Sequence, residues 1–176
     1  MANTYVKVDV HLIFHVKITS CPIRTDDLNR LFVYLGGIIR GVKGFPIAIG
    51  GMTDHIHILA SVPKQMALSE FTRIIKTSSN KWLKTLDKHY MLFSWQTGYG
   101  AFAVSPTLLE KTKRYILNQA VHHQKHTFRE EYILFLNAYG IDYDERYLFS
   151  VTPAGAAQDG RSQSWYPDEI KEFVVH

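Results

Sequence analysis

The stretch "FPIAIGGMTDHIHILASVP", residues 45–63, decides the fold of this chain. Two β-prone runs flank Thr53 and Asp54, a pair typical of a turn, so we predict a β-hairpin. Successive side chains of a strand point to opposite faces, so His55 and His57 are expected to project from the same face of the second strand. Two imidazoles on one rigid strand are either two ligands of one metal ion or part of a polar sheet face.

The neighbouring patterns place this hairpin in an α+β fold. Residues 5–17 alternate between apolar and polar side chains, which predicts a half-buried strand with His11 and His15 on its polar face. Thr25 is expected to cap the helix that follows. The further predicted elements are helices at 26–40, 69–88, 106–125 and 128–139 and a strand at 99–105. The order β-α-β-β-α-β, followed by helices, is typical of the ferredoxin-like split βαβ motif, an antiparallel sheet with helices on one face.

The composition is that of an ordinary globular protein. The chain has 176 residues, of which 46% are hydrophobic and 20% charged, and we expect one domain over residues 1–150 with a C-terminal extension over 151–176. No apolar run approaches the roughly 20 residues that span a bilayer, and the first residues do not resemble a signal peptide. The single cysteine, Cys21, excludes an internal disulfide and a cysteine-based metal cage. We therefore expect a cytoplasmic protein with no membrane partner.

Positive charge gathers in the middle of the chain. Residues 64–114 contain nine Lys or Arg against three Asp or Glu, whereas residues 115–176 contain five against nine. This asymmetry suggests a polyanionic partner, although a solvated helix face is the simpler explanation. Basic and amide side chains opposite the apolar stripe of helix 69–88 suit contacts with phosphates. The candidate DNA contacts are Arg73, Lys76, Asn80 and Lys84 on that helix and His122 further along the chain.

The predicted helix at 106–125 supplies further reactive groups. Tyr115 and Gln119 are four residues apart and share a helix face, which His122 continues. Histidine nitrogens from the strand and an amide oxygen from the helix would make a mixed site that suits Mg²⁺ or Mn²⁺ holding a phosphate, with zinc as an alternative. His11 and His15 are weaker candidates for additional ligands or phosphate contacts.

Tyrosine chemistry would explain how such a site acts on DNA. A phenol, with an unperturbed pKa of about 10, becomes a covalent nucleophile when it is activated or when its target is polarised. Attack on a phosphodiester gives a phosphotyrosine and a free sugar hydroxyl, which conserves the bond energy without ATP. The sequence also lacks a GxxxxGK[ST] motif, so we expect no nucleotide cofactor. Taken singly, each of these residues is more often a packing residue than a catalytic one.

Three stretches together resemble a known family. "DHIHILASVP" (54–63), "FSWQTGYGAFAVS" (93–105) and "KRYILNQAVHHQKHTFREEY" (113–132) resemble motifs of the single-tyrosine HUH transposases of the insertion-sequence type, the IS200/IS605-like family. "VDVHLIFHVK" (8–17) and "YGIDYDERYLF" (139–149) also fit. The resemblance covers about residues 5–149 and leaves the C-terminal extension without a counterpart.

The resemblance implies a specific activity. His55 and His57 would be paired ligands of Mg²⁺ or Mn²⁺, Gln119 the third protein ligand, and Tyr115, on a C-terminal helix, the nucleophile that forms a 5′-phosphotyrosine. The protein would cleave and rejoin single-stranded DNA that carries hairpins. It would work as a homodimer whose sheets join and in which the tyrosine helix can dock against the other subunit.

Three alternatives remain at this point. The first is a domesticated relative that uses the same chemistry to nick and rejoin repeated chromosomal hairpins. The second is a noncatalytic ferredoxin-like module that binds nucleic acid. The third is a zinc hydrolase in which His55, His57 and His122 hold the metal and water is the nucleophile.

Overall fold

The strands and helices follow the predicted order. The computed structural model describes residues 3–124 and 126–149, and the chain divides into two units, Met1–Gln124 and Lys125–His176. The first unit contains, in order, β1 (Asp9–His15), α1 (Thr25–Gly41), β2 (Phe45–Gly51), β3 (His55–Ser61), α2 (Leu68–Leu86), the 3-10 turn η1 (Lys88–Tyr90), β4 (Gly100–Ala103), the 3-10 turn η2 (Pro106–Leu108), α3 (Leu109–Leu117) and α4 (Gln119–His122). The second unit contains α5 (Phe128–Ala138) and α6 (Glu145–Leu148).

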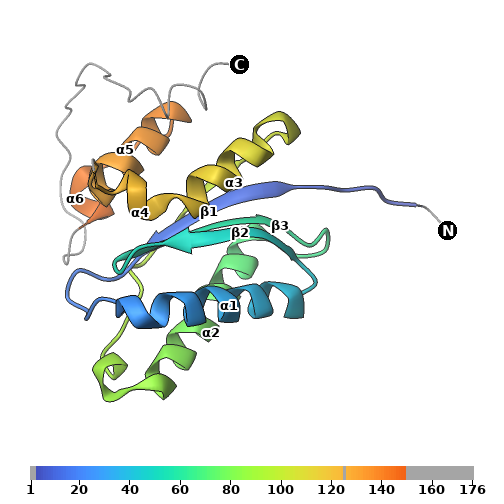
Figure 1. Cartoon of the computed structure of the whole chain (residues 1–176). Helices are drawn as coiled ribbons and strands as arrows, with labels where there is room; N and C mark the ends of the chain where they lie inside the picture. The colour runs from blue at the N-terminus through green and yellow to red at the C-terminus, as the bar shows by residue number, and fades with distance from the viewer. Residues whose placement is uncertain (1–2, 125, 150–176) are drawn as a thin grey trace. The chain divides into compact units, whose positions relative to one another are not determined.

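Antiparallel pairing joins the four strands in the order β2-β3-β1-β4. The predicted hairpin is confirmed as β2 and β3 (Figure 1), and β1 lies between β3 and β4. In the pairing of β1 with β3, Ile13 lies opposite His57 and His15 lies opposite His55. This strand order, with its helices, confirms the α+β, ferredoxin-like fold expected from the sequence.

One face of the sheet carries the main hydrophobic core. Ile56 and Ile58 of β3 belong to the same buried cluster as Leu35 of α1 and Phe71 of α2. Both helices therefore lie on this face, whereas α3 contacts β2 and β3 from the opposite side (Figure 1). The β3 side chains that point away from the core face α3, so the two histidines are directed toward the helix that carries Tyr115.

The start of α1 differs from the prediction. Thr25 is already the first helical residue, and Arg24 occupies the N-cap position without a side-chain cap hydrogen bond. The hydroxyl of Tyr90 instead accepts a hydrogen bond from the backbone N–H of Arg24 and donates one to the carboxylate of Asp27. A tertiary contact that the local sequence does not reveal thus fixes the first turn.

The helix predicted at 106–125 is not continuous. It is divided into η2, α3 and α4, and the break falls at Asn118, whose φ of −101° and ψ of 20° leave the helical range. Asparagine is tolerated at helix ends because its short side chain competes with the backbone for hydrogen bonds. Tyr115 and Gln119 therefore lie on two successive helices. The next predicted helix is confirmed as α5. Thr127 is its N-cap residue and forms a reciprocal capping box.

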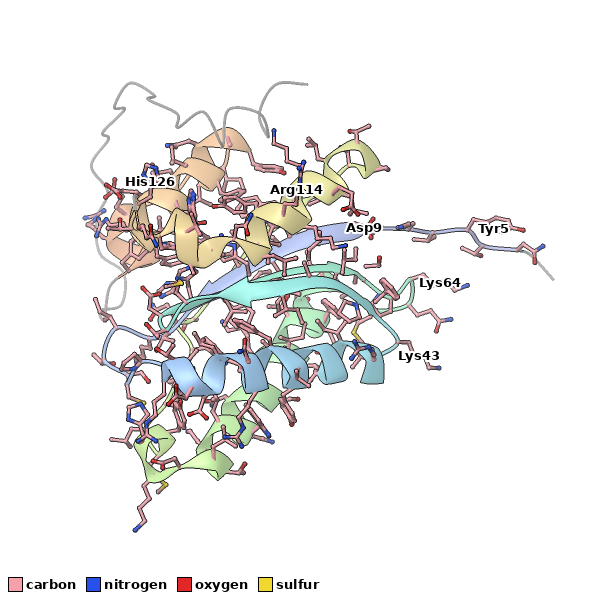
Figure 2. All side chains as sticks on the ribbon, in the orientation of Figure 1. Tyr5, Asp9, Lys43, Lys64, Arg114 and His126 are labelled. Atoms are coloured by element: carbon pink, nitrogen blue, oxygen red, sulfur yellow. The ribbon has the colours of Figure 1, made fainter. Side chains whose placement is uncertain are left out.

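Helix α3 approaches β2 closely at Gly50. A Cβ atom at Gly50 would lie 2.3 Å from the carbonyl oxygen of Ile116, which is nearer than nonbonded atoms can come. Gly50 also pairs with His57 across the hairpin. The absence of a side chain at Gly50 therefore allows the α3 backbone to lie close to the hairpin, beside β3. Figure 2 shows Arg114 of α3 and Lys43, which follows α1, on opposite sides of the sheet.

Lys76 of α2 binds the backbone of the segment that leads into β4. Its ammonium group donates hydrogen bonds to the backbone carbonyls of Gln96 and Gly98 and lies 5.8 Å from the centre of the Phe14 ring. Burial lowers the pKa of Lys76 to about 8, from an ordinary value of 10.5. Lys76 is thus a structural contact in this chain.

The predicted boundary between a domain over 1–150 and an extension over 151–176 stays a prediction, because the extension lies outside the described residues. Within the part of the chain that the structure describes, no helix combines the length and hydrophobicity that crossing a bilayer requires.

We expect Gly50→Ala to lower the free energy of unfolding by about 1–3 kcal/mol, because the added methyl group collides with backbone that cannot rotate away. Gly37→Ala is the matched control: Gly37 is an exposed position in α1 whose Cβ would meet no atom within 4 Å, and alanine there should stabilise by about 0.5–1 kcal/mol. Urea unfolding of both variants measures the difference. Equal stability of the two variants would contradict the close approach.

We also expect a pH dependence that depends on Lys76. Its pKa is lower in the folded chain than in the unfolded chain, so between about pH 8 and pH 10.5 the unfolded chain retains a proton that the folded chain has released. The free energy of unfolding of the wild type should therefore rise relative to that of Lys76→Met over this range. Urea unfolding of both proteins across the range tests this, and a constant difference would show that the Lys76 pKa is not lowered.

Candidate metal and tyrosine site

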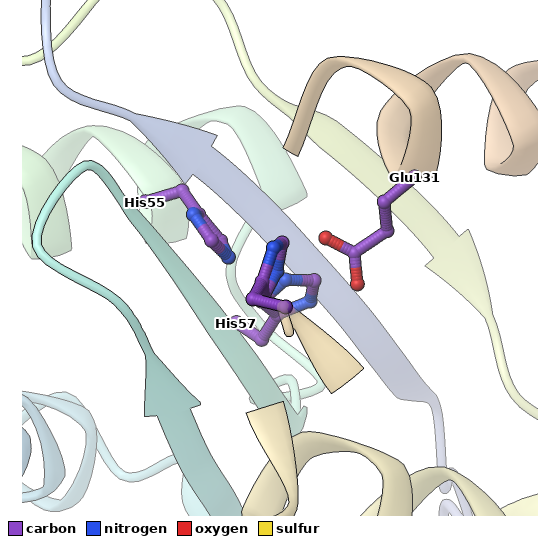
Figure 3. A group of neighbouring side chains, drawn as sticks. His55, His57 and Glu131 are labelled. Carbon is purple, nitrogen blue, oxygen red and sulfur yellow. The ribbon is translucent and has the colours of Figure 1, made fainter. Parts of the chain in front are cut away.

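His55 and His57 lie on the same side of β3, as the alternation of strand side chains predicts (Figure 3). Both imidazoles are completely buried, while Ile56 and Ile58 between and beyond them point into the core. Glu131, the other residue labelled in Figure 3, belongs to α5 of the second unit. The pair therefore belongs to a polar interior on the α3 side of the sheet.

A neighbouring side chain contacts the Nδ1 atom of each histidine. The Asp54 carboxylate lies 2.7 Å from Nδ1 of His55, and Nε2 of His11 lies 2.9 Å from Nδ1 of His57. Burial alone would raise the pKa of Asp54, but its hydrogen bond with His55 and the attraction of the nearby imidazoles outweigh burial and lower that pKa. A metal-binding histidine commonly donates its second N–H to such a partner, which orients the ring. Both rings are thus arranged to offer Nε2 as a ligand.

Tyr115 of α3 lies over this polar interior. Its ring centre is 6.1 Å from that of His57 and 6.4 Å from that of His11. Its hydroxyl lies 3.5 Å from Nε2 of His122, at the long end of hydrogen-bond distances. The neighbouring Ile116 is buried against Ala48 and Leu59 of the sheet, which fixes the helix on this face. A phenol therefore lies beside the paired imidazoles within one chain.

The segment after the break at Asn118 brings two more ligand-type groups to His55. The side-chain oxygen of Gln119 lies 3.4 Å from Nε2 of His55, and the His123 ring centre lies 4.5 Å from the His55 ring centre. The ligand nitrogens of His55, His57 and His123 all lie within 4.8 Å of one another. The predicted set of two histidines and Gln119 thus meets in space, together with a third imidazole.

These residues fit a divalent metal ion. With metal–ligand bonds of about 2.1 Å, neighbouring ligand atoms lie about 3 Å apart and opposite ones about 4.2 Å apart. The separation of 3.4 Å between His55 Nε2 and the Gln119 oxygen falls inside this range. The donors are imidazole nitrogens and an amide oxygen, a mixed set that suits a first-row divalent ion.

The predicted DNA contacts do not gather around this site. Arg73, Lys76, Asn80 and Lys84 belong to α2, on the core side of the sheet, whereas the histidines face α3. Arg73 forms an exposed ion pair with Glu70, and Lys76 binds the segment before β4. His122, the fifth candidate, lies instead beside the Tyr115 hydroxyl. A role of the α2 residues in DNA binding stays a prediction.

Sequence reasoning missed the partners of the paired histidines and the position of His123. Asp54 immediately precedes His55, and a carboxylate next to a candidate metal-binding histidine is a usable signal. The alternation of residues 5–17 places His11 on the correct strand face, but its contact with His57 requires knowledge of the strand register. His123 lies four residues after Gln119, and this spacing, which places two side chains on one side of a helical turn, is a usable signal.

Comparison with known proteins adds the family. The sequence pattern described as "Transposase IS200 like" matches residues 4–119. This range includes both β3 histidines, Tyr115 and Gln119, and ends before His122. No curated protein matches the chain.

Two solved structures share the fold. One is a protein of Deinococcus radiodurans R1 described as a candidate transposase, with 22% identity over 68% of this chain and 96% of its own and a TM-score of 0.53. The other is a REP-associated tyrosine transposase bound to a REP hairpin, with 17% identity over 92% of this chain and 98% of its own and a TM-score of 0.53. At such identities the likeness concerns the fold alone, and the matched pattern carries the assignment: this chain belongs to the family of IS200-like transposases.

Proposed function

We propose that this protein cleaves and rejoins single-stranded DNA with Tyr115 as the nucleophile and a divalent metal ion held by His55, His57 and Gln119. The observation that carries the proposal is the position of the Tyr115 ring, 6.1 Å from the His57 ring, in a chain whose Gln119 oxygen lies 3.4 Å from His55. Membership of a transposase family supports DNA as the substrate.

The chain's own groups suggest how the reaction runs. The Tyr115 oxygen attacks the phosphorus of a DNA phosphodiester, an oxygen–phosphorus bond forms, and the bond from phosphorus to the 3′ oxygen breaks. The phenol loses its proton and the departing 3′ oxygen gains one, so a 5′-phosphotyrosine and a 3′ hydroxyl result. His122, 3.5 Å from the phenol oxygen, is placed to accept the phenol proton. A bound Mg²⁺ or Mn²⁺ would supply charge neutralisation at the phosphate oxygens.

Hairpin-bearing single-stranded DNA is the proposed partner. The REP-associated tyrosine transposase with the same fold is bound to a REP hairpin, and the net charge of +4 suits a polyanion. Tyr115 meets the histidines of its own chain, which supports cleavage within one subunit. We also propose a homodimer with joined sheets, which the family resemblance implies. Such a dimer would hold two DNA ends together. Mobilising an element and processing repeated chromosomal hairpins share this chemistry.

We expect wild-type protein mixed with a single-stranded hairpin DNA and Mn²⁺ or Mg²⁺ to form a protein–DNA adduct that survives denaturing electrophoresis. Tyr115→Phe should abolish the adduct because the attacking oxygen is gone. His57→Ala should abolish it because a ligand is lost. Tyr34→Phe is the matched control, since Tyr34 stacks on Trp82 between α1 and α2, on the other face of the sheet, and should cleave normally.

The same variants separate cleavage within a subunit from cleavage between subunits. A mixture of Tyr115→Phe with His57→Ala should stay inactive if each tyrosine serves its own histidines. Recovery of the adduct in the mixture would instead require a shared site. Free cleaved ends without any adduct, in wild type and in Tyr115→Phe alike, would replace the tyrosine mechanism with hydrolysis by water.

His11 should act as an orienting residue for His57. Loss of its acceptor nitrogen in His11→Leu should weaken Mn²⁺ binding by about 10–100-fold, the usual effect of removing a partner of a metal-binding histidine. His11→Gln retains an acceptor oxygen and should recover part of the affinity. Titration of Mn²⁺ by electron paramagnetic resonance measures both. Equal affinities in wild type and His11→Leu would remove His11 from this role.

A further inference from the structure

We propose that His123 is an additional protein ligand of the metal ion, so that the site presents three imidazoles and one amide oxygen. The inference rests on the proposed metal site of His55, His57 and Gln119 and extends it to a residue beyond the matched family pattern, which ends at Gln119. The ligand nitrogens of the three histidines lie within 4.8 Å of one another.

The local backbone explains how His123 reaches the site. The N–H of His123 donates to the carbonyl oxygen of Gln119 at 2.9 Å, which is the four-residue spacing of one helical turn. Side chains four residues apart lie on the same side of such a turn. Gln119 and His123 therefore approach His55 together, one through an oxygen 3.4 Å from Nε2 and the other through a ring centred 4.5 Å away.

Simple packing explains this arrangement less well. Apolar rings would fill the same interior without the free-energy cost of burying imidazole nitrogens. That cost is offset when the nitrogens form hydrogen bonds or bind a metal ion. His123 also follows directly after His122, which faces the phenol instead. The two adjacent histidines thus serve two different partners.

A third imidazole has a consequence for metal choice. Mg²⁺ prefers oxygen ligands, whereas imidazole nitrogen favours first-row transition ions such as Mn²⁺. A set of two nitrogens and one oxygen tolerates either ion. A set of three nitrogens and one oxygen shifts the preference toward Mn²⁺ and its heavier neighbours. His123 is therefore a determinant of which metal the protein selects.

The test measures metal binding without DNA. Pulsed electron paramagnetic resonance of the Mn²⁺-loaded wild type should count three coordinated imidazoles, and this measurement needs no variant. His123→Phe keeps a ring for packing and removes the nitrogens, so Mn²⁺ affinity should fall by at least about tenfold, no less than for loss of an orienting partner, with a smaller change for Mg²⁺. His123→Gln, which offers an oxygen, should bind with two imidazoles and show a weaker preference for Mn²⁺ over Mg²⁺.

His89→Gln is the matched control, since His89 belongs to η1 and contacts the backbone oxygen of Pro22, and it should leave Mn²⁺ affinity unchanged. Two coordinated imidazoles in the wild type, or unchanged Mn²⁺ affinity in His123→Phe, would overturn the inference. Absence of Mn²⁺ binding would overturn both this inference and the proposed metal site. Three imidazoles without a DNA adduct would retain His123 as a ligand and refute the tyrosine mechanism, whereas an adduct with two imidazoles would do the reverse.

Discussion

The register between β1 and β3 is the constraint on which the rest of the structure depends. Ile13 lies opposite His57 and His15 opposite His55, so that one face of both strands carries imidazoles and the other carries the main core. The side-chain period of a strand is two residues. A shift of the register by one residue would therefore point the histidines of β3 into the core and the isoleucines of β3 away from it. Burial of the apolar face therefore fixes the polar face as well.

Helix α3 turns that polar face into an enclosed site. Its backbone reaches the sheet only because Gly50 has no side chain, and the buried Ile116 fixes its depth. The paired histidines are oriented by Asp54 and His11. After the break at Asn118, α4 begins with Gln119, whose side-chain oxygen lies 3.4 Å from Nε2 of His55. Strand register, helix docking and helix termination each position a different group of the same site.

Much of the fold follows from the sequence, because the patterns that specify it are local. Alternation in β1 and in the hairpin and the apolar stripe of α2 are visible within short windows. The sequence-based predictions are wrong where distant contacts or backbone geometry determine the structure. Tyr90 fixes the start of α1 in place of a cap by Thr25, and the break at Asn118 divides a helix that the residue spacing alone predicts as continuous.

The positions of the candidate residues follow from the sequence in part, for the same reason. His55 and His57 share a face by strand periodicity alone, and their meeting with Tyr115 and Gln119 was expected from the family resemblance. The contacts of His11 with His57 and of His123 with His55 join segments that lie far apart in the chain, so no local pattern reveals them. The sequence did not reveal where the basic residues of α2 lie relative to the site, since a charged helix face does not indicate which side of the sheet it will occupy.

The spacing of the site's parts along the chain has a consequence for the order of folding. The β2–β3 hairpin closes a short loop, whereas the contacts of His57 with His11 and of His55 with Gln119 join residues 46 and 64 positions apart. Closing longer loops costs more chain entropy and slows the contacts that depend on it. We therefore expect nascent chains to place the two strand histidines early and to complete the ligand set only when α3 and α4 pack against the sheet.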